Sequence, residues 1–324
     1  MKKKKKIITH KKSYPLEKSP LFKTSYINRL LDILEINRQT FDSIIENKEH
    51  LYHLFTQGKR EIQKPINELY NVHNRIASLL LRITQPDFVF SGIRGRSYIE
   101  NAKEHVRAKE MLTTDITSFF PSTRRKMIFW FFKENLQCSY KIANFLADLC
   151  SIDDHLPTGS QISIPLAFWV NSKMFDELNL LATKNNLKMT LYVDDITFSG
   201  DKIPKGFKYQ IEKIINKHRH NIKLNKTTLY KGQSVKEVTG LILQDGDILP
   251  PNRQFKKLYL SLNRWKNLIS EKGNGEKIEW QYPRIIGLLN NISYFKPEYK
   301  SVIYAIHKEF YQYKNMPSNY KKLN

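Results

Sequence analysis

Two adjacent carboxylates, Asp194 and Asp195, lie in the stretch LYVDDITFSG of a chain that has 54 Lys and Arg against 31 Asp and Glu. Apolar residues alternate with polar ones on both sides of the pair, which is the period-two pattern of two strands. We therefore predict a tight hairpin with both acids at or beside its turn. Asp is a common turn residue, but two like charges in contact repel each other unless a cation lies between them.

A third acid, Asp115, ends a predicted strand in the stretch MLTTDITSFFPS. Mg²⁺ takes oxygen ligands and usually completes its shell with water and substrate phosphates. Two such ions, roughly 4 Å apart, activate a 3′-hydroxyl and stabilise a leaving pyrophosphate during in-line transfer. Asp115, Asp194 and Asp195 are thus candidate catalytic and metal-binding residues, with two Mg²⁺ ions, or Mn²⁺ in their place, as the expected cofactor.

The composition favours a polyanionic partner. A net charge of +23 and a sequence pI near 9.7 make nucleic acid the leading partner class, ahead of a membrane surface. No apolar run is long enough for a membrane span, and the basic start of the chain lacks the apolar core of a secretory signal. We interpret Lys2 to Lys6 as a disordered basic arm, and Cys138 and Cys150 as buried thiols of a cytoplasmic protein.

The elements that would position the acids have an α+β pattern, with helices around a mostly antiparallel sheet. Asp153 and Asp154, the other acid pair, lack strand flanks and are predicted to lie in a plain loop. Apolar spacing predicts two helices within 24–56 and further helices over 66–84, 125–136, 140–150, 164–185 and 207–218. Strands are predicted over 108–115, 188–192, 196–199, 237–243 and 247–249.

With these motifs in order, the chain resembles reverse transcriptases from about Arg60 to Leu249. YVDD and DITSFF resemble the two catalytic motifs of that family, and residues 155–178, which begin HLPTGSQ, resemble the segment between them that starts with Pro-Gln-Gly. LNKTTLY and GKREIQKP resemble the flanking nucleotide-binding motifs. The resemblance implies that the metals are bound by Asp115, Ile116, Asp194 and Asp195. It implies that the nucleotide is bound by Arg60, Phe120, Thr158, Gly159 and Lys226.

Two further stretches resemble signatures of retron reverse transcriptases. NAKEH, with Asn101 and His105, is similar to the NAxxH signature, and Val238-Thr239-Gly240 is similar to the VTG signature near the primer grip. By this resemblance, these five residues and Tyr192 are assigned to RNA or primer binding. His105 taken alone is more typical of an ordinary, partly buried histidine.

One segment departs from the family pattern. Thr158 stands where many members have Gln, and Ser163-Ile164-Pro165 replaces a Ser-Pro pair. A Thr hydroxyl cannot reproduce a long amide stacked on the nucleotide sugar, so handling of template or nucleotide is the property expected to differ.

The resemblance implies a right-hand polymerase fold with fingers, palm and a helical thumb. Its expected divisions are a basic arm over 1–23, fingers over 24–107, a palm over 108–249 with an interleaved fingers segment, and a thumb over 250–324. The apolar stripe of the thumb is expected to form core. Its Tyr, Trp and Arg residues are alternatively available to stack on unpaired bases or to bind phosphates of a structured RNA.

The function implied is that of a retron reverse transcriptase, an RNA-directed DNA polymerase. Such an enzyme copies a cognate structured noncoding RNA into multicopy single-stranded DNA joined to RNA, starting from a branched 2′–5′ link, and acts in phage defence with an effector protein. Its partners would be that RNA, the DNA product, dNTPs and the effector, with no membrane. The alternatives are a defence-associated or abortive-infection reverse transcriptase with another priming mode, and an RNA-binding scaffold without turnover.

Overall fold

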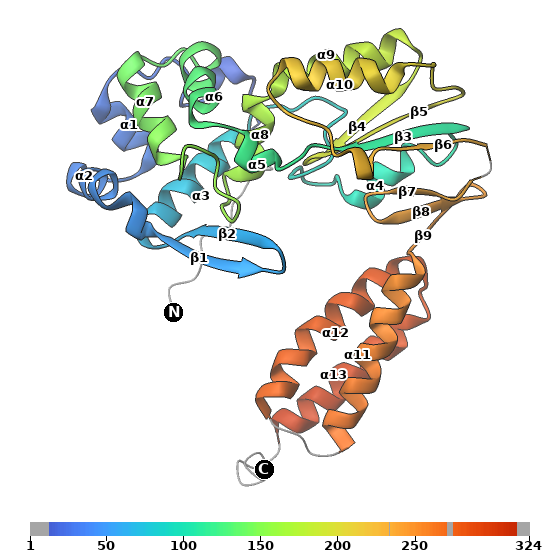
Figure 1. Ribbon diagram of the computed structural model, residues 1–324. Coiled ribbons are helices and arrows are strands. Elements are labelled where there is room, and N and C mark those ends of the chain that lie inside the picture. The colour runs from blue at the N-terminus through green and yellow to red at the C-terminus, as the bar shows by residue number, and fades with distance from the viewer. Residues whose placement is uncertain (1–12, 233, 271–274, 316–324) are drawn as a thin grey trace. The chain divides into compact units, whose positions relative to one another are not determined.

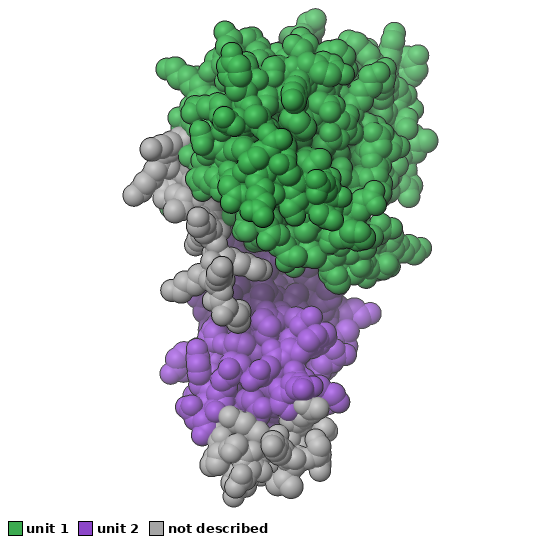
Figure 2. Space-filling view, turned by 90° about the vertical axis from the view of Figure 1, so that its left-hand side faces the viewer, with its two compact units in different colours: residues 1–232 green, residues 233–324 purple. Residues whose placement is uncertain are grey.

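The computed structural model describes residues 13–232, 234–270 and 275–315. The chain forms two compact units, residues 1–232 and 233–324 (Figure 2). Each unit has its own hydrophobic core. No helix in the described ranges is both long and apolar enough to cross a membrane. The predicted basic arm at Lys2 to Lys6 lies outside the described residues.

A four-stranded antiparallel sheet forms the centre of unit 1. Its strands are β3 (Glu110–Asp115), β4 (Lys188–Tyr192), β5 (Asp195–Gly200) and β6 (Thr228–Tyr230), in the order β4-β5-β3-β6. Helices α9 (Ser172–Lys184) and α10 (Phe207–Lys217) cover one face, and α4 (Tyr98–Lys103) lies on the other (Figure 1). The predicted strands 108–115, 188–192 and 196–199 are confirmed within one or two residues, whereas α4 and β6 were not predicted.

Helices and one hairpin make up the rest of unit 1. The hairpin joins β1 (Tyr52–Gln57) to β2 (Arg60–Pro65), and Gln57 pairs with Arg60 across a turn in which Gly58 has a φ of +65°. The remaining α-helices are α1 (Ile27–Leu34), α2 (Arg38–Asn47), α3 (Asn67–Leu81), α5 (Phe119–Ser122), α6 (Arg125–Trp130), α7 (Tyr140–Leu149) and α8 (Ser163–Val170). Short 3₁₀ segments cover Leu16–Lys18, Lys48–Leu51 and Leu224–Lys226, and a π-helical turn covers Phe131–Asn135.

Two helix predictions need correction. The second helix expected within 24–56 ends at Asn47, and residues 52–57 form β1, because they pair with β2 instead of burying a helical stripe. The helix expected over 164–185 is broken at Asn171. The side-chain Nδ2 of Asn171 donates to the Ala167 carbonyl (2.9 Å) and to the Thr123 hydroxyl (3.2 Å). A side chain that bonds to the carbonyl four residues earlier competes with the backbone hydrogen bonds of the helix.

The described part of unit 2 contains a small sheet and three helices. The sheet has the strands β7 (Lys236–Val238), β8 (Leu241–Gln244) and β9 (Asp247–Leu249), and the helices are α11 (Asn252–Ser270), α12 (Gly275–Phe295) and α13 (Tyr299–Lys314). The strand predicted over 237–243 is interrupted at Thr239 and Gly240, which form the turn between β7 and β8. Trp265 fills the helical core, and its indole N–H donates to the Glu309 carboxylate at 2.6 Å.

The architecture confirms the α+β class with antiparallel sheets. The boundaries expected for arm, fingers, palm and thumb are divisions by role, and they stay predictions. The division into compact units after Gly232 is a separate property of the fold.

Candidate active site

The acid pair lies at and beside a two-residue hairpin turn, as the sequence predicts. Tyr192 at the end of β4 pairs with Asp195 at the start of β5, so that Val193 and Asp194 form the turn. Val193 has a φ of +61°. A left-handed backbone is a genuine outlier for a β-branched residue, and strain of this kind persists only where the surroundings hold it.

Asp115 is brought directly opposite this turn. It ends β3 and is the register partner of Asp195 on the neighbouring strand. The Ile116 amide donates to the Asp194 carbonyl at 3.2 Å, and the Lys223 amide donates to the Asp115 carbonyl at 2.8 Å. The fold thus joins three acids that lie up to 80 positions apart in the sequence, with Asp115 buried and the other two half-buried.

The negative charges of the two hairpin carboxylates, Asp194 and Asp195, are only partly balanced by nearby positive charge. Burial, followed by the negative charge of Asp115, raises the pKa of Asp194 above its ordinary value. Burial and the charges of Asp194 and Asp115 raise the pKa of Asp195 to about 6. An opposite charge placed among these groups would favour their ionised forms.

Two cationic side chains act on this acidic cluster. The Lys226 ammonium donates to Asp115 Oδ2 at 2.5 Å, and this bond is the main reason that the pKa of Lys226 is raised. Arg60 is exposed at the start of β2, and its charge lowers the pKa of Asp194 against the larger effect of burial. Both basic residues assigned to nucleotide binding thus interact electrostatically with the acids, Lys226 with Asp115 and Arg60 with Asp194.

The donor set suits a hard divalent cation. Among the residues that the structure describes, no three His, Cys, Asp or Glu side chains already form a metal-binding group, and Lys226 engages one oxygen of Asp115. Carboxylate oxygens are nevertheless the ligands that Mg²⁺ prefers. Three such groups, two of them with raised pKa values, fit a cation that replaces the lysine contact.

The two aromatic rings of DITSFF differ in environment. Phe119 is 4% exposed and packs against Phe175 and His220, whereas Phe120 is only partly buried. Phe119 is therefore the core residue of the pair. Phe120 is accessible enough to contact a nucleotide. Its assignment as the ring under the incoming sugar stays a prediction.

Thr158 and Gly159 attach the loop before α8 to β2. The Thr158 hydroxyl donates to the Glu61 carbonyl at 2.7 Å and accepts from the Gln63 amide at 3.2 Å. A Cβ at Gly159 would lie 2.6 Å from the Ile62 side chain and 3.0 Å from the Gln63 carbonyl, so only glycine allows this close approach. Thr158 thus has a structural role here, and its assignment to nucleotide binding stays a prediction.

Asn101 and His105 of the NAKEH stretch lie inside unit 1. His105 has no exposed surface, and its two ring nitrogens bond to the hydroxyls of Ser199 (2.6 Å) and Thr190 (2.7 Å) on β5 and β4. Asn101 is 1% exposed, and its Oδ1 has no hydrogen-bond partner among the described residues. Any influence of His105 on RNA would be indirect, through the sheet, and the assignment of both residues to RNA binding stays untested.

The VTG stretch forms a tight turn in unit 2. Val238 is buried and pairs with Leu241, while Thr239 and Gly240 have φ values of +46° and +81°. Two residues with positive φ between paired strands are the pattern of a type I′ hairpin, which accounts for the glycine. The primer-binding assignment of these three residues stays a prediction.

Asp153 and Asp154 also have positive φ and form the turn between Ile152 and His155, which confirms the loop prediction.

Sequence reasoning missed two supports of the site. The Ser91 hydroxyl accepts from the Val193 amide at 3.0 Å. His220 bonds to Ser122 of α5 (2.7 Å) and to Asn171 (2.8 Å). These contacts connect residues 49 to 102 positions apart, and no local motif marks them.

The chain is similar to several retron reverse transcriptases, although no protein-family model matches the sequence. The chain is 28% identical over 237 residues to Retron Se72 reverse transcriptase of Salmonella heidelberg, covering 68% of this chain and 62% of that protein. It is 24% identical over 245 residues to Retron Ec86 reverse transcriptase of Escherichia coli, covering 72% and 76%. It is 25% identical over 249 residues to Retron Ec48 reverse transcriptase of Escherichia coli, covering 69% and 61%. The match thus spans less than two thirds of two of these three relatives.

Proposed function

The chain is similar to retron reverse transcriptases over 68 to 72% of its length, which confirms the resemblance predicted from the motifs, and we propose that it is an RNA-directed DNA polymerase of that kind. The observation that carries the proposal is the convergence of Asp115, Asp194 and Asp195 at one end of the central sheet. A scaffold without turnover would have no use for three mutually repelling acids on a chain of net charge +23.

The chain's own residues have separable roles in this proposal. Two Mg²⁺ ions bound by the three carboxylates and the Ile116 carbonyl would activate the primer hydroxyl and neutralise the leaving pyrophosphate. Lys226 bonds to Asp115 Oδ2 until the substrate arrives, and its ammonium then turns to the phosphates. Arg60 binds the triphosphate from the edge of the hairpin β1–β2. Phe120 supports the deoxyribose.

The fold would serve this reaction as a right hand. In this interpretation the sheet β4-β5-β3-β6 is the palm, the hairpin β1–β2 and the surrounding helices are fingers, and α11 to α13 form the thumb. We propose that the template is a cognate structured noncoding RNA, that the product is single-stranded DNA joined to it, and that the protein works in the cytoplasm with an effector protein in phage defence. The free thiols of Cys138 and Cys150 suit that compartment.

Removing one carboxylate charge tests the proposal. Asp194→Asn keeps the shape of the side chain but removes charge needed to bind the metals, so primer extension is expected to fall below detection. RNA affinity, which the basic surface provides, should stay within about twofold. Both are measured on the purified protein, by extension of a primer with dNTPs and by filter binding of RNA.

Asp154→Asn is the matched control, because it removes the same charge from the other acid pair at a position whose positive φ suits Asn. It should extend primers at the parent rate. An Asp194→Asn protein with a tenth of the parent rate would refute the two-metal assignment. Sequencing of nucleic acid that copurifies with the parent protein tests the retron assignment, because RNA-linked DNA of fixed sequence is expected.

A further inference from the structure

Residues 86–91, which we call the strap, run beside the outer edge of β4. The Leu191 amide donates to the Phe88 carbonyl at 2.7 Å, and the Phe90 amide donates to the Leu191 carbonyl at 2.9 Å. These bonds make a parallel bridge between Val89 and Leu191. The strap thus continues the central sheet at the strand that enters the YVDD turn.

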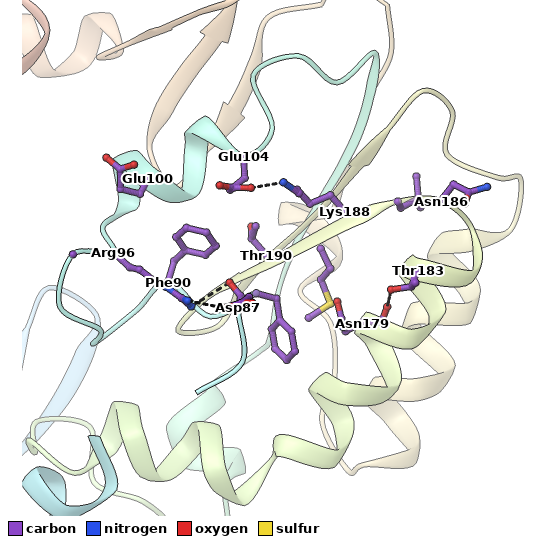
Figure 3. A pocket seen from close by; sticks show the side chains of 14 residues that line it. Asp87, Phe90, Arg96, Glu100, Glu104, Asn179, Thr183, Asn186, Lys188 and Thr190 are labelled. Carbon is purple, nitrogen blue, oxygen red and sulfur yellow. Dashed lines mark hydrogen bonds and ion pairs between the residues drawn. The ribbon is translucent and has the colours of Figure 1, made fainter. Parts of the chain in front are cut away.

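Arg96 holds the strap in shape. Its Nη1 donates to the carbonyls of Pro86 (2.9 Å), Asp87 (3.1 Å) and Val89 (2.7 Å), and its Nη2 bonds to the Asp87 carboxylate at 2.9 Å. The guanidinium also lies 5.6 Å from the centre of the Phe90 ring. Figure 3 shows Arg96, Asp87 and Phe90 together in the wall of a cavity of about 730 Å³. A single side chain therefore fixes three carbonyls of the strap.

The strap ends at the strained residue of the catalytic turn. Ser91 is 6% exposed, and its hydroxyl accepts from the Val193 amide at 3.0 Å. The Val193 amide bonds outside its own hairpin, to Ser91. Leaving such a buried amide without a hydrogen-bond partner would destabilise the folded protein. Gly92, with a φ of +72°, then lets the chain turn away from β4.

We propose that Ser91 and Arg96 are positioning residues for the YVDD turn: Arg96 fixes the strap, and the Ser91 hydroxyl holds Val193 in its left-handed conformation so that Asp194 and Asp195 face Asp115. This inference rests on the proposed function for its kinetic consequence. The contact itself does not depend on that function, because it is a property of the folded chain. Neither residue touches substrate in this account.

Ser91→Ala removes the acceptor and leaves the backbone of the strap in place. Without the bond the turn relaxes from its strained conformation, so the maximal rate of single-nucleotide incorporation should fall roughly tenfold, the size of one lost buried hydrogen bond. The KM for dNTP should change by less than about twofold, because Ser91 makes no substrate contact. Ser91→Thr keeps the hydroxyl and should restore most of the rate. Arg96→Lys, whose three N–H groups cannot bond to three carbonyls and to the Asp87 carboxylate together, should resemble Ser91→Ala.

Amide hydrogen exchange of the peptide that contains residues 191–196 gives a second measurement, independent of activity. Exchange there should be faster in Ser91→Ala than in the parent and slow again in Ser91→Thr. Ser139→Ala is the matched control, because its hydroxyl also accepts a backbone amide, that of Ile142 at the start of α7, and it should leave this peptide and the rate unchanged.

Parent-like exchange and rate in Ser91→Ala would overturn the inference. A different result would be a parent protein that makes no DNA, with faster exchange in Ser91→Ala and slow exchange again in Ser91→Thr. That result would refute the proposed function and leave the positioning contact intact.

Discussion

Phe119 and Phe120 show how one backbone step separates a packing residue from a candidate selectivity residue. Phe119 is buried against Phe175 and His220, and Phe120 is left partly accessible. The helix α5 that bears both rings is held by residues outside it: the Leu156 amide donates to the Thr123 carbonyl at 3.0 Å, and the Ser122 hydroxyl bonds to His220 at 2.7 Å. Rotation of α5 would therefore break several bonds at once, so the two rings are not free to exchange places.

Phe120→Ala is expected to relax the choice of sugar. Removing the ring makes room for a 2′-hydroxyl, so the efficiency of GTP incorporation should rise relative to that of dGTP, with some loss of dGTP binding. Steady-state incorporation of both nucleotides by parent and mutant measures this ratio. Phe119→Ala is the control, since it should cost about 3 to 5 kcal/mol of stability without changing the ratio. A changed ratio in Phe119→Ala alone would mean that the roles are reversed.

At the scale of elements, the sequence predicts what local pattern determines. The alternation around Asp194 and Asp195 predicts β4, β5 and the turn between them, and the turn is where the structure has it. By contrast, β1 is exposed at five of its six residues and β2 buries the polar Gln63, so no alternation of apolar and polar residues marks this hairpin. The break at Asn171 and the contact of Ser91 with Val193 depend on residues distant in sequence. The acids of the site could therefore be predicted, whereas the contacts that hold them could not.

His105 connects two strands of the central sheet from within. Its ring bonds to Thr190 of β4 and Ser199 of β5, and burial lowers its pKa to about 3. The ring is therefore neutral in the folded protein at any ordinary pH. In the unfolded chain it would take up a proton near pH 6.5.

The stability of the sheet should consequently fall as the pH is lowered. Above pH 6.5 both states are neutral and His105 makes no pH-dependent contribution. Below pH 6.5 the unfolded state binds the additional proton, so the unfolding free energy should fall by about 1.4 kcal/mol per pH unit for this group. The opening free energy of β4 and β5 from hydrogen exchange, measured between pH 6.5 and 5, tests this. His105→Gln should be less stable at pH 7 and have a shallower slope; an unchanged slope would contradict the neutral, buried ring.

The whole molecule combines a local acidic site with a large basic excess. The net charge of +23 provides attraction to phosphates that is independent of sequence, and this part of binding weakens steeply with salt. Unit 2 contributes lysines and arginines on the surface of its helices together with exposed aromatic rings, among them Tyr259, Trp280 and Tyr304. The guanidinium of Arg284 lies 3.4 Å from the centre of the Trp280 ring, so this pair presents a flat, cationic surface. The apolar stripe of residues 250–324 thus forms core, as expected, whereas aromatic rings on the outer face of these helices are exposed to solvent.

Charge and stacking on this unit should affect RNA binding in different ways. Lys256 and Lys257 are exposed on α11. If they contact phosphates, changing both to Gln should weaken binding of the cognate RNA and of an unrelated hairpin RNA equally. The change should also reduce the slope of log affinity against log salt by about 2. Trp280→Ala should instead weaken only the cognate RNA, by roughly 1 to 3 kcal/mol, because stacking on unpaired bases depends on how the loop presents them. Filter binding of both RNAs at several salt concentrations separates the two effects. Equal loss for both RNAs in Trp280→Ala would place specific recognition elsewhere, and a chimera with residues 250–324 from a retron reverse transcriptase would then still copy the original RNA.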